Sequence, residues 1–429
     1  MKPVILLYAM ISVLVCVSVA DGSVVFVPGD QPTIQDGIDA AETGDTVLVF
    51  DGTYTGDGNR DIQFFGKSIL LKSVNGADTC IIDCQGSETD PHRGFIFESF
   101  ETESAVLDGF TIQNAYWIQY EPYISAAGIH VAWASPTIQN CIIRNCVAHT
   151  AGGVLLGGSN SLLLNCEIRD NSAGDYAGGL DISTLANPVV ANCLITGNFA
   201  NLGGGGVCVG FDSRPIIFNC TITLNNTSRG HGGGLHVYNS DLSVFNCILW
   251  DNPPEEIAYW GEIPNVRYSD VKDGFFGQGN IDANPRFVQG VSGSYCLSQI
   301  AAGQTLDSPC VDAGNDLAEL ICCPFYQEVI CMDDFSTRTD NVTDEAMVDM
   351  GYHTLITPPC VHDGDVNGSG DITSADGQQA FIIMLGAGSP TYEEMCAADC
   401  NGDGLVTSGD AQLIFMAAMG VEDCADPLR

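Results

Sequence analysis

Residues 178–196, GGLDISTLANPVVANCLIT, contain the phrase that determines the fold of this chain. A glycine pair and an aliphatic residue open the phrase, and Asn-Cys, one further residue and an aliphatic residue close it. The glycine half recurs at Gly152, Gly178, Gly205 and Gly233, with a weaker copy at Ala127. The cysteines recur at positions 141, 166, 193, 220 and 247, in steps of 25, 27, 27 and 27 residues. A fixed period of this length is typical of a repeat architecture.

Each repeat contains short apolar runs, none of which is long enough for a helix. Examples are Ser161–Leu164 and Pro215–Phe218, and the runs are separated by Gly, Asn, Asp and Ser clusters typical of turns. Short strands repeated in register would stack on their copies in the next turn at about 4.8 Å. The pattern therefore predicts a parallel β-solenoid. Its five Asn-Cys asparagines would form a hydrogen-bonded ladder, and its five cysteines a column that faces inward.

These repeats resemble those of the right-handed parallel β-helix repeat proteins of bacteria, and they are similar to repeats of pectate-lyase-like folds. The resemblance covers about residues 21–353 and implies a mainly β fold class without implying one function. Leu107–Ile112 is a degenerate copy in which Phe110 takes the cysteine position. Before it, Pro32–Ala41 predicts a short amphipathic helix, and Gly44–Val49 predicts the first buried strand.

Met1–Ala20 has the features of a secretory signal peptide: Lys2, an apolar run, and Ser18-Val19-Ala20 as a small-residue cleavage site. Cys16 suggests a lipoprotein signal as an alternative, although Val15 stands where a small residue is wanted. No other stretch reaches about 18 apolar residues, so we expect no membrane span. The protein is therefore expected to be secreted, either released or held at the cell surface.

Two loops of twelve residues near the C-terminus have the composition of calcium sites. They begin at Asp365 and Asp399 and read DVNGSGDITSAD and DCNGDGLVTSGD. Each loop has oxygen-bearing side chains at positions 1, 3, 5, 9 and 12, glycine at position 6 for a sharp turn, and a backbone carbonyl at position 7. The expected Ca²⁺ ligands are Asp365, Asn367, Ser369, Asp371, Thr373 and Asp376 in loop one, and Asp399, Asn401, Asp403, Leu405, Thr407 and Asp410 in loop two.

An apolar helix is expected after each loop, over Ala375–Leu385 and Gly409–Met419. The duplicated loop and helix resemble the type I dockerin, which also has Asp at position 12, and the match covers about residues 363–424. Ser369 at position 5 departs from that pattern. The resemblance implies a small α-helical module that binds Ca²⁺ and docks onto a cohesin-like domain of a scaffold protein. A calcium-stabilised tail without a cohesin partner is the alternative.

The chain thus divides into five expected segments. These are a signal peptide (1–20), an N-terminal cap with the first coils (21–75), the β-helix repeats (76–270), C-terminal closing coils (271–358) and the dockerin-like module (363–424).

The chain is strongly acidic, with 14 Lys and Arg against 54 Asp and Glu and a formal net charge of −40. This charge argues against nucleic acids and anionic membranes as partners, because both require basic surfaces. Export permits disulfides. We expect the repeat cysteines to be buried and to act as small apolar side chains. The expected disulfide candidates are Cys80 with Cys84, the group from Cys296 to Cys331, and the tail cysteines Cys360, Cys396, Cys400 and Cys424.

The second residue after each glycine pair is expected to point outward, because neighbours on a strand alternate between faces. This row contains His130, Leu155, Asp181, Cys208 and His236. Asp181 and His236 are the weak catalytic candidates, two coils or about 10 Å apart. The sequence shows no Asp-Asp pair and no serine, cysteine or P-loop nucleophile motif, and we expect isolated polar side chains here to be solvated.

Two classes of function remain. In the first, a secreted calcium-binding β-helix protein docks through its tail and presents a solenoid face for glycan or protein binding. In the second, a polysaccharide lyase or glycoside hydrolase of the β-helix type is attached to a scaffold by its dockerin. The regular repeats favour the first class. A compact cluster of three or four acidic or basic residues on one outer face would favour the second.

Overall fold

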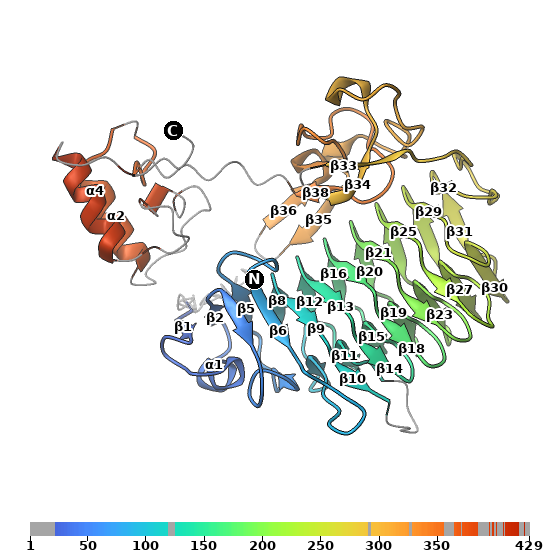
Figure 1. Ribbon diagram of the computed structural model, residues 1–429, viewed down its shortest axis with the longest axis horizontal. Helices are drawn as coiled ribbons and strands as arrows, with labels where there is room; N and C mark the ends of the chain where they lie inside the picture. The colour runs from blue at the N-terminus through green and yellow to red at the C-terminus, as the bar shows by residue number, and fades with distance from the viewer. Residues whose placement is uncertain are drawn as a thin grey trace, which may run out of the picture.

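The computed structural model describes residues 22–118, 125–290, 293–325, 328–355, 364–369, 371–384, 394, 397, 398, 400, 406, 408–419 and 424. Its main body is a parallel β-solenoid (Figure 1). Sheets A, B, D and C follow one another in each full coil, so β12, β13, β14 and β15 make one turn before β16 starts the next. The mainly β fold class is confirmed. The expected signal peptide lies outside the described residues.

The bounds of the solenoid strands are as follows. Sheet A contains β1 (Val24–Val27), β2 (Thr46–Val49), β5 (Leu70–Ser73), β8 (Val106–Asp108), β12 (Thr137–Gln139), β16 (Leu162–Leu164), β20 (Val189–Ala191), β24 (Ile216–Phe218), β28 (Ser243–Phe245) and β31 (Asn265–Arg267). Sheet B contains β3 (Gly52–Tyr54), β6 (Cys80–Asp83), β9 (Thr111–Gln113), β13 (Ile142–Arg144), β17 (Glu167–Arg169), β21 (Leu194–Thr196), β25 (Thr221–Thr223), β29 (Ile248–Trp250) and β32 (Asp270–Val271). Sheet D contains β10 (Tyr116–Trp117), β14 (Val147–Ala148), β18 (Ser172–Ala173), β22 (Phe199–Ala200) and β26 (Asn226–Thr227). Sheet C contains β4 (Ile62–Gln63), β7 (Phe95–Phe97), β11 (Ile129–Ala132), β15 (Val154–Gly157), β19 (Leu180–Ser183), β23 (Val207–Gly210), β27 (Leu235–Tyr238) and β30 (Ile257–Trp260).

The repeat cysteines form the predicted inward column. All five are buried in the core that runs along the solenoid axis, and Phe110 continues the column in the preceding coil. Each thiol donates to the backbone carbonyl two residues earlier, as Cys193 Sγ does to Ala191 O at 3.2 Å. Burial raises the pKa of the thiols of Cys141, Cys166, Cys193 and Cys220 well above the usual value, so these four side chains are neutral, apolar groups.

The Asn-Cys asparagines turn the chain from sheet A to sheet B. Each adopts a left-handed conformation, with φ of 53° at Asn140 and 50° at Asn165, which asparagine tolerates better than most residues. The predicted ladder is present in part: Asn165 Nδ2 donates to Asn140 Oδ1 at 2.8 Å, and Asn192 Nδ2 donates to Asn165 Oδ1 at 3.1 Å. Asn219 Nδ2 donates instead to Asp349 O at 3.2 Å, and the ladder resumes where Asn246 Nδ2 donates to Asn219 Oδ1 at 3.3 Å.

A second asparagine ladder lies inside the solenoid and was not predicted. Asn171, Asn198, Asn225 and Asn252 are at most 1% exposed and stack at 27-residue intervals. The side-chain carbonyls of Asn198, Asn225 and Asn252 each accept from the backbone and side-chain amides of the asparagine in the preceding coil, and Asn171 Oδ1 accepts from Cys146 N at 3.0 Å. The ladder therefore satisfies the buried backbone amides between sheets B and D.

The glycine pairs allow consecutive coils to approach closely between sheets D and C. A Cβ atom on Gly153 would lie 2.5 Å from Gly179 O, and one on Gly179 would lie 2.6 Å from Gly206 O. Any side chain at these positions would push neighbouring coils apart, which explains why the glycine half of the phrase recurs.

The N-terminal end carries the predicted helix, α1 (Ile34–Ala40), whose N-cap Thr33 accepts from Asp36 N through its side chain. The strand expected in Gly44–Val49 is present as β2, with Val47 and Val49 buried, but it is not the first strand of the chain. β1 comes first, and it pairs in parallel with β2, where Val25 lies opposite Val47.

The segment expected to form closing coils instead forms antiparallel pairs along the side of the solenoid. The pairs are β33 (Phe287–Gly290) with β34 (Gly293–Leu297), β35 (Cys322–Phe325) with β36 (Glu328–Cys331), and β37 (Phe335–Ser336) with β38 (Thr354–Leu355). Three short 3-10 helices lie among them: η1 (Ile300–Ala302), η2 (Ala318–Leu320) and η3 (Met332–Asp334).

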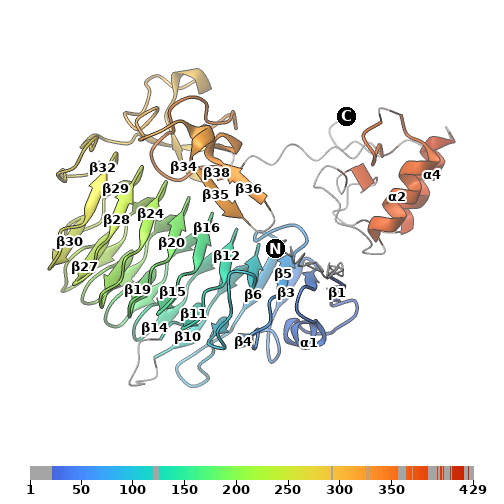
Figure 2. The same cartoon turned by 180° about the vertical axis from the view of Figure 1, so that it is seen from behind.

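The physical reason is an apolar row on the outer face of sheet A. Leu164, Ala191 and Phe218 point outward there and are buried against residues such as Met332 and Phe335 of the later segment. Figure 2 shows this segment, in orange, beside the strands of sheet A. Burial of this apolar row stabilises the packing of the later segment against sheet A.

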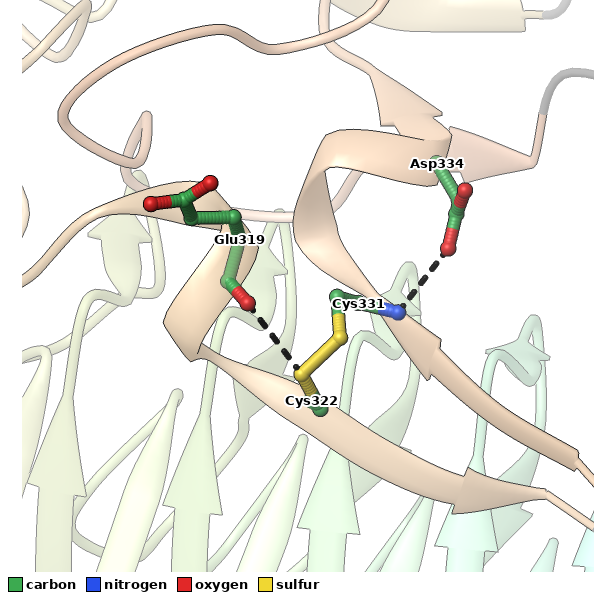
Figure 3. Close-up of a disulfide and its surroundings, with 4 residues drawn as sticks. All are labelled: Glu319, Cys322, Cys331 and Asp334. Carbon is green, nitrogen blue, oxygen red and sulfur yellow. Dashed lines mark hydrogen bonds between the residues drawn. A yellow bond between two sulfur atoms is a disulfide. The ribbon is translucent and has the colours of Figure 1, made fainter.

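Two of the three expected groups of disulfide candidates contain a disulfide. Cys322 bonds to Cys331 across the β35–β36 pair (Figure 3), and Cys400 bonds to Cys424 in the tail. The Cys80–Cys84 expectation was wrong, since both thiols are free and buried. Residues four apart on an extended strand are about 13 Å apart, too far for a disulfide. The side chains of Cys360 and Cys396 lie outside the described residues.

The tail contains two helices, α2 (Ser374–Met384) and α4 (Ser408–Ala418), each beginning one residue before the predicted start. They pack together, and a Cβ atom on Gly377 of α2 would lie 2.9 Å from the Phe415 ring of α4. In the described part of the chain, no helix is long and apolar enough to cross a membrane.

Candidate functional site

Hydrogen bonds within loop one of the tail link several of its predicted ligands to one another. Asp365 Oδ1 accepts from Ser369 N at 2.9 Å, and Ser369 Oγ donates to Asp371 O at 3.2 Å. Asp376 is fully buried and accepts from Asn367 N at 3.0 Å and from Thr373 N at 2.8 Å. These contacts bring together the carboxylate, hydroxyl and carbonyl oxygens that Ca²⁺ prefers, so the donor set of loop one fits this ion.

Loop two is described only at its last ligand position. Asp410 is fully buried in the first turn of α4, as Asp376 is in α2. Asp399, Asn401, Asp403, Leu405 and Thr407 lie outside the described residues, and their assignment as ligands remains a prediction.

The predicted outward row on sheet C is present in register. His130, Leu155, Asp181, Cys208 and His236 lie side by side on β11, β15, β19, β23 and β27. Our expectation that these polar side chains are solvated was wrong, because Asp181 is 3% exposed and His236 is 6% exposed.

His236 is buried by aromatic rings from other coils. The ring of Tyr176 stacks on it with centroids 5.7 Å apart, and Trp260 meets it edge-on at 5.1 Å. Gly203 lies between the Tyr176 and His236 coils, and a Cβ atom there would be 2.8 Å from His236 Nδ1. This glycine therefore makes the room in which the two rings stack.

The row does not form an activated nucleophile. Cys208 separates Asp181 from His236, and its Sγ lies 3.7 Å from His236 Nδ1. Burial raises the pKa of the Cys208 thiol well above its usual value and lowers the pKa of His236. Both groups are therefore neutral near pH 7, whereas a reactive cysteine requires a thiolate. Burial also raises the pKa of Asp181 to about 6.

A cleft of about 340 Å³ lies over the outer face of sheet B, and the sequence did not predict it. Glu167 and Arg169 of β17 and Thr196 of β21 line one side. Tyr295 of β34 and Tyr352 of the side segment line the other. The Tyr295 hydroxyl and Thr196 Oγ1 are 2.9 Å apart, which links the two sides.

Charged and hydroxyl groups converge in this cleft. Arg169 Nε donates to Glu167 Oε2 at 3.3 Å, and Arg169 Nη1 donates to Asp170 Oδ2 at 3.3 Å. Arg144 lies opposite Arg169 on the neighbouring strand. Burial raises the pKa of Glu167, although Arg169 opposes the shift. Glu167, Arg169 and Asp170 line the cleft, and ionisable side chains of this kind, one of them a carboxyl with a raised pKa, can bind and orient a polar ligand.

The charged side of this cleft could have been predicted from the sequence. Glu167, Ile168 and Arg169 alternate polar, apolar and polar residues, which places both charges on the outer face. Tyr295 and Tyr352 come from more than 120 positions later in the chain, and no repeat pattern relates them to Glu167.

The comparisons with known proteins agree with the architecture. The family described as "Right handed beta helix region" matches residues 127–253, and the "Dockerin type I domain" matches residues 363–416. A search of curated proteins found no match.

Among solved structures, a pectate lyase, Pel9A, is 14% identical with a TM-score of 0.39, over 70% of this chain and 93% of its own. A pectin methylesterase from carrot is 13% identical with a TM-score of 0.31, over 62% of this chain and 85% of its own. Both similarities are too low to bear on activity. From its repeats, its solenoid and the two matching families, the chain is a right-handed parallel β-helix repeat protein with a C-terminal type I dockerin domain.

Proposed function

We propose that the chain is an extracellular polysaccharide-binding protein that attaches through its dockerin domain, in the presence of Ca²⁺, to a cohesin-like scaffold domain. The cleft over sheet B is the observation that carries the binding proposal. Hydroxyl groups of Thr196 and Tyr295, an arginine and two carboxyls line it, and such groups donate to and accept from sugar hydroxyls. Its walls come from the solenoid and the side segment, so a ligand would be held between them.

Two observations support calcium-dependent docking. Loop one gathers oxygen ligands around Asp365 and Asp376, and helices α2 and α4 pack against each other as a duplicated pair. Ca²⁺ bound to the folded loops but not to the unfolded chain would stabilise this pair. Calcium would thereby control whether the docking surface is formed.

We expect the full-length protein to bind two Ca²⁺ ions and to gain helical circular dichroism when calcium is added. The double variant Asp365→Ala/Asp399→Ala should lose both responses, because it removes the first carboxylate of each loop. Calorimetric titration and the signal at 222 nm measure the two effects.

Asp371→Ala is the matched control. Asp371 lies in the same loop and is exposed, but its expected ligand is the backbone carbonyl, which alanine keeps. This variant should bind Ca²⁺ nearly as tightly as the unaltered chain. Calcium binding that survives in the double variant would show that the loops are assigned incorrectly.

For the cleft, we expect Ser294→Trp to weaken binding of a soluble polysaccharide by at least about tenfold, equal to about 1.4 kcal/mol. Ser294 lies on β34 at the cleft, so a large ring there would fill the space without disturbing the solenoid core. Affinity electrophoresis against neutral and acidic polysaccharides measures the change.

Gln289→Trp is its control. Ser294 Oγ donates to Gln289 Oε1 at 2.7 Å, so both variants lose the same hydrogen bond, but Gln289 does not line the cleft. Equal weakening by the two variants would refute the cleft as the binding site.

A polysaccharide lyase or glycoside hydrolase is the second candidate, and Glu167 favours it. A carboxyl with a raised pKa can serve as a general acid, and Asp170 lies on the opposite side of Arg169. The same polysaccharide samples can be assayed for new reducing ends or unsaturated sugars. Products that disappear with Glu167→Gln would favour the enzyme over the binding protein.

A further inference from the structure

A row of exposed apolar side chains follows the corner at which each coil passes from sheet C to sheet A. We call this row the apolar ridge. Its members are Phe65 (56% exposed), Phe100 (78%), Trp133 (58%), Leu185 (59%), Phe211 (55%), Tyr238 (45%) and Trp260 (47%). They stand at the ends of β4, β7, β11, β19, β23, β27 and β30 or just after them. Beside β15 the chain has Gly158, over which the Trp133 ring lies, so the ridge crosses this coil too.

The backbone at the ridge is unusual for such residues. Phe65, Phe100, Trp133, Leu185 and Phe211 have φ values of 52°, 61°, 55°, 64° and 58°, in the left-handed region. Large side chains rarely adopt this conformation, because Cβ crowds the following carbonyl.

The other corners show what the fold alone requires. From sheet A to sheet B the left-handed positions include asparagines such as Asn140, with Tyr268 as an exception, and from sheet B to sheet D they include Asn145, Asp170 and Gly197, with Leu224 as an exception. A short polar residue or glycine therefore turns most coils at these corners. Exposure in water gives the ridge side chains no compensating burial, so folding does not account for their size.

Neighbouring rings hold part of the ridge in place. Phe211 and Tyr238 meet edge-on with centroids 6.3 Å apart, and Trp260 packs edge-on against His236 at 5.1 Å. His236 in turn is fixed by the stacked Tyr176 ring. These rings are thus ordered before any ligand arrives, which lowers the entropic cost of binding.

We propose that the apolar ridge binds an uncharged linear polysaccharide that runs parallel to the solenoid axis. From β4 to β30 the ridge spans seven strand steps, or about 34 Å. An extended chain of pyranose sugars repeats at close to the strand step of about 4.8 Å, and the C–H faces of its rings can lie on aromatic rings. Each coil from β4 to β30, except the β15 coil with Gly158, would therefore offer one ridge residue to the sugar chain.

Charge decides between this ligand and others. Glu98, Asp212 and Glu262 are exposed beside ridge residues, and the whole chain has a formal net charge of −40. Acidic polysaccharides, anionic lipid surfaces and a second copy of this chain would all be repelled. A neutral polysaccharide brings no such repulsion. The ridge lies on a different corner from the cleft, so this inference does not depend on the cleft.

The test is sedimentation of the full-length protein with microcrystalline cellulose and with chitin. We expect retention on at least one of them, and at least a tenfold loss of affinity in Trp133→Asn/Phe211→Asn. Asparagine suits the left-handed conformation at both positions, so this variant should remain folded, which its β-sheet circular dichroism can verify.

Phe276→Asn removes an equally exposed aromatic residue outside the ridge (63% exposed) and should bind as the unaltered chain does. Ser294→Trp, which fills the cleft, should also leave this binding intact. No retention on either polysaccharide would overturn the proposal. So would equal binding by the ridge variant, or self-association of the unaltered chain that the ridge variant abolishes.

Discussion

Asn198→Leu is expected to lower the free energy of unfolding of the β-solenoid by about 4 kcal/mol. The Asn198 side chain makes four hydrogen bonds inside the core. It accepts from Asn171 N at 3.0 Å and Asn171 Nδ2 at 3.1 Å, and it donates to Ile168 O at 2.8 Å and Asn225 Oδ1 at 2.9 Å. Leucine has a similar size but neither donates nor accepts, so the buried Asn171 amide would lose its partner.

Urea denaturation followed by tryptophan fluorescence measures this effect. All four tryptophans, Trp117, Trp133, Trp250 and Trp260, lie in the solenoid, so the signal reports this part alone. Asn187→Leu is the control, because Asn187 is exposed and its bonds to Asn160 Oδ1 and Leu185 O face solvent. We expect a loss below about 1 kcal/mol there. Similar losses in both variants would show that the inner ladder adds nothing to stability.

Asp181→Asn is expected to stabilise the solenoid at neutral pH by up to about 3 kcal/mol. Asp181 is buried, and its Oδ1 has no hydrogen-bond partner among the described residues. Burial disfavours the charged carboxylate and raises the pKa of Asp181 to about 6, from an ordinary value of 3.8. Asparagine has the same shape without the charge, and its amide can reach the Ser183 hydroxyl on the same strand face.

The stability difference between Asp181→Asn and the unaltered chain should depend on pH. Because the folded state holds the Asp181 proton more tightly than the unfolded state, the cost of Asp181 is absent below about pH 4. The cost grows as the pH rises from about 4 to about 6 and is constant above that range. The two proteins should therefore be equally stable at pH 4, and the variant should be more stable at pH 7.

Denaturation at several pH values, again followed by tryptophan fluorescence, tests this. Asp212→Asn changes an exposed carboxylate in a neighbouring coil and should have little effect at any pH. A stability difference between Asp181→Asn and the unaltered chain that does not change with pH would contradict the assignment of a raised pKa. An Asp181→Asn variant less stable at pH 7 would indicate that the carboxylate has a partner in solution.

The repeating part of the structure could be predicted because its determinants are local and periodic. Cys193 and Asn192 occupy the same places in their coil as Cys166 and Asn165 in the coil before, so recognising the period also places them in register. A calcium loop beginning at Asp365 is predicted for a similar reason, since all its expected ligands come from twelve consecutive residues. The inner ladder through Asn198 has the same period but was not predicted. Its asparagines are not followed by a shared residue such as the cysteine of the Asn-Cys pairs.

The sequence by itself thus determined the solenoid and the inward cysteine column, and it predicts a ligand set for the two calcium loops. Only the tertiary structure decided that Asp181 and His236 are buried, that Met332 and Phe335 pack on sheet A, and that Tyr295 closes a cleft over Glu167. It also showed that Trp133 and Phe211 are exposed and have a left-handed backbone conformation. The physical reason is that these features depend on contacts between side chains far apart in the sequence. Their formation depends on shape and apolar burial in the folded chain, which no single period in the sequence records.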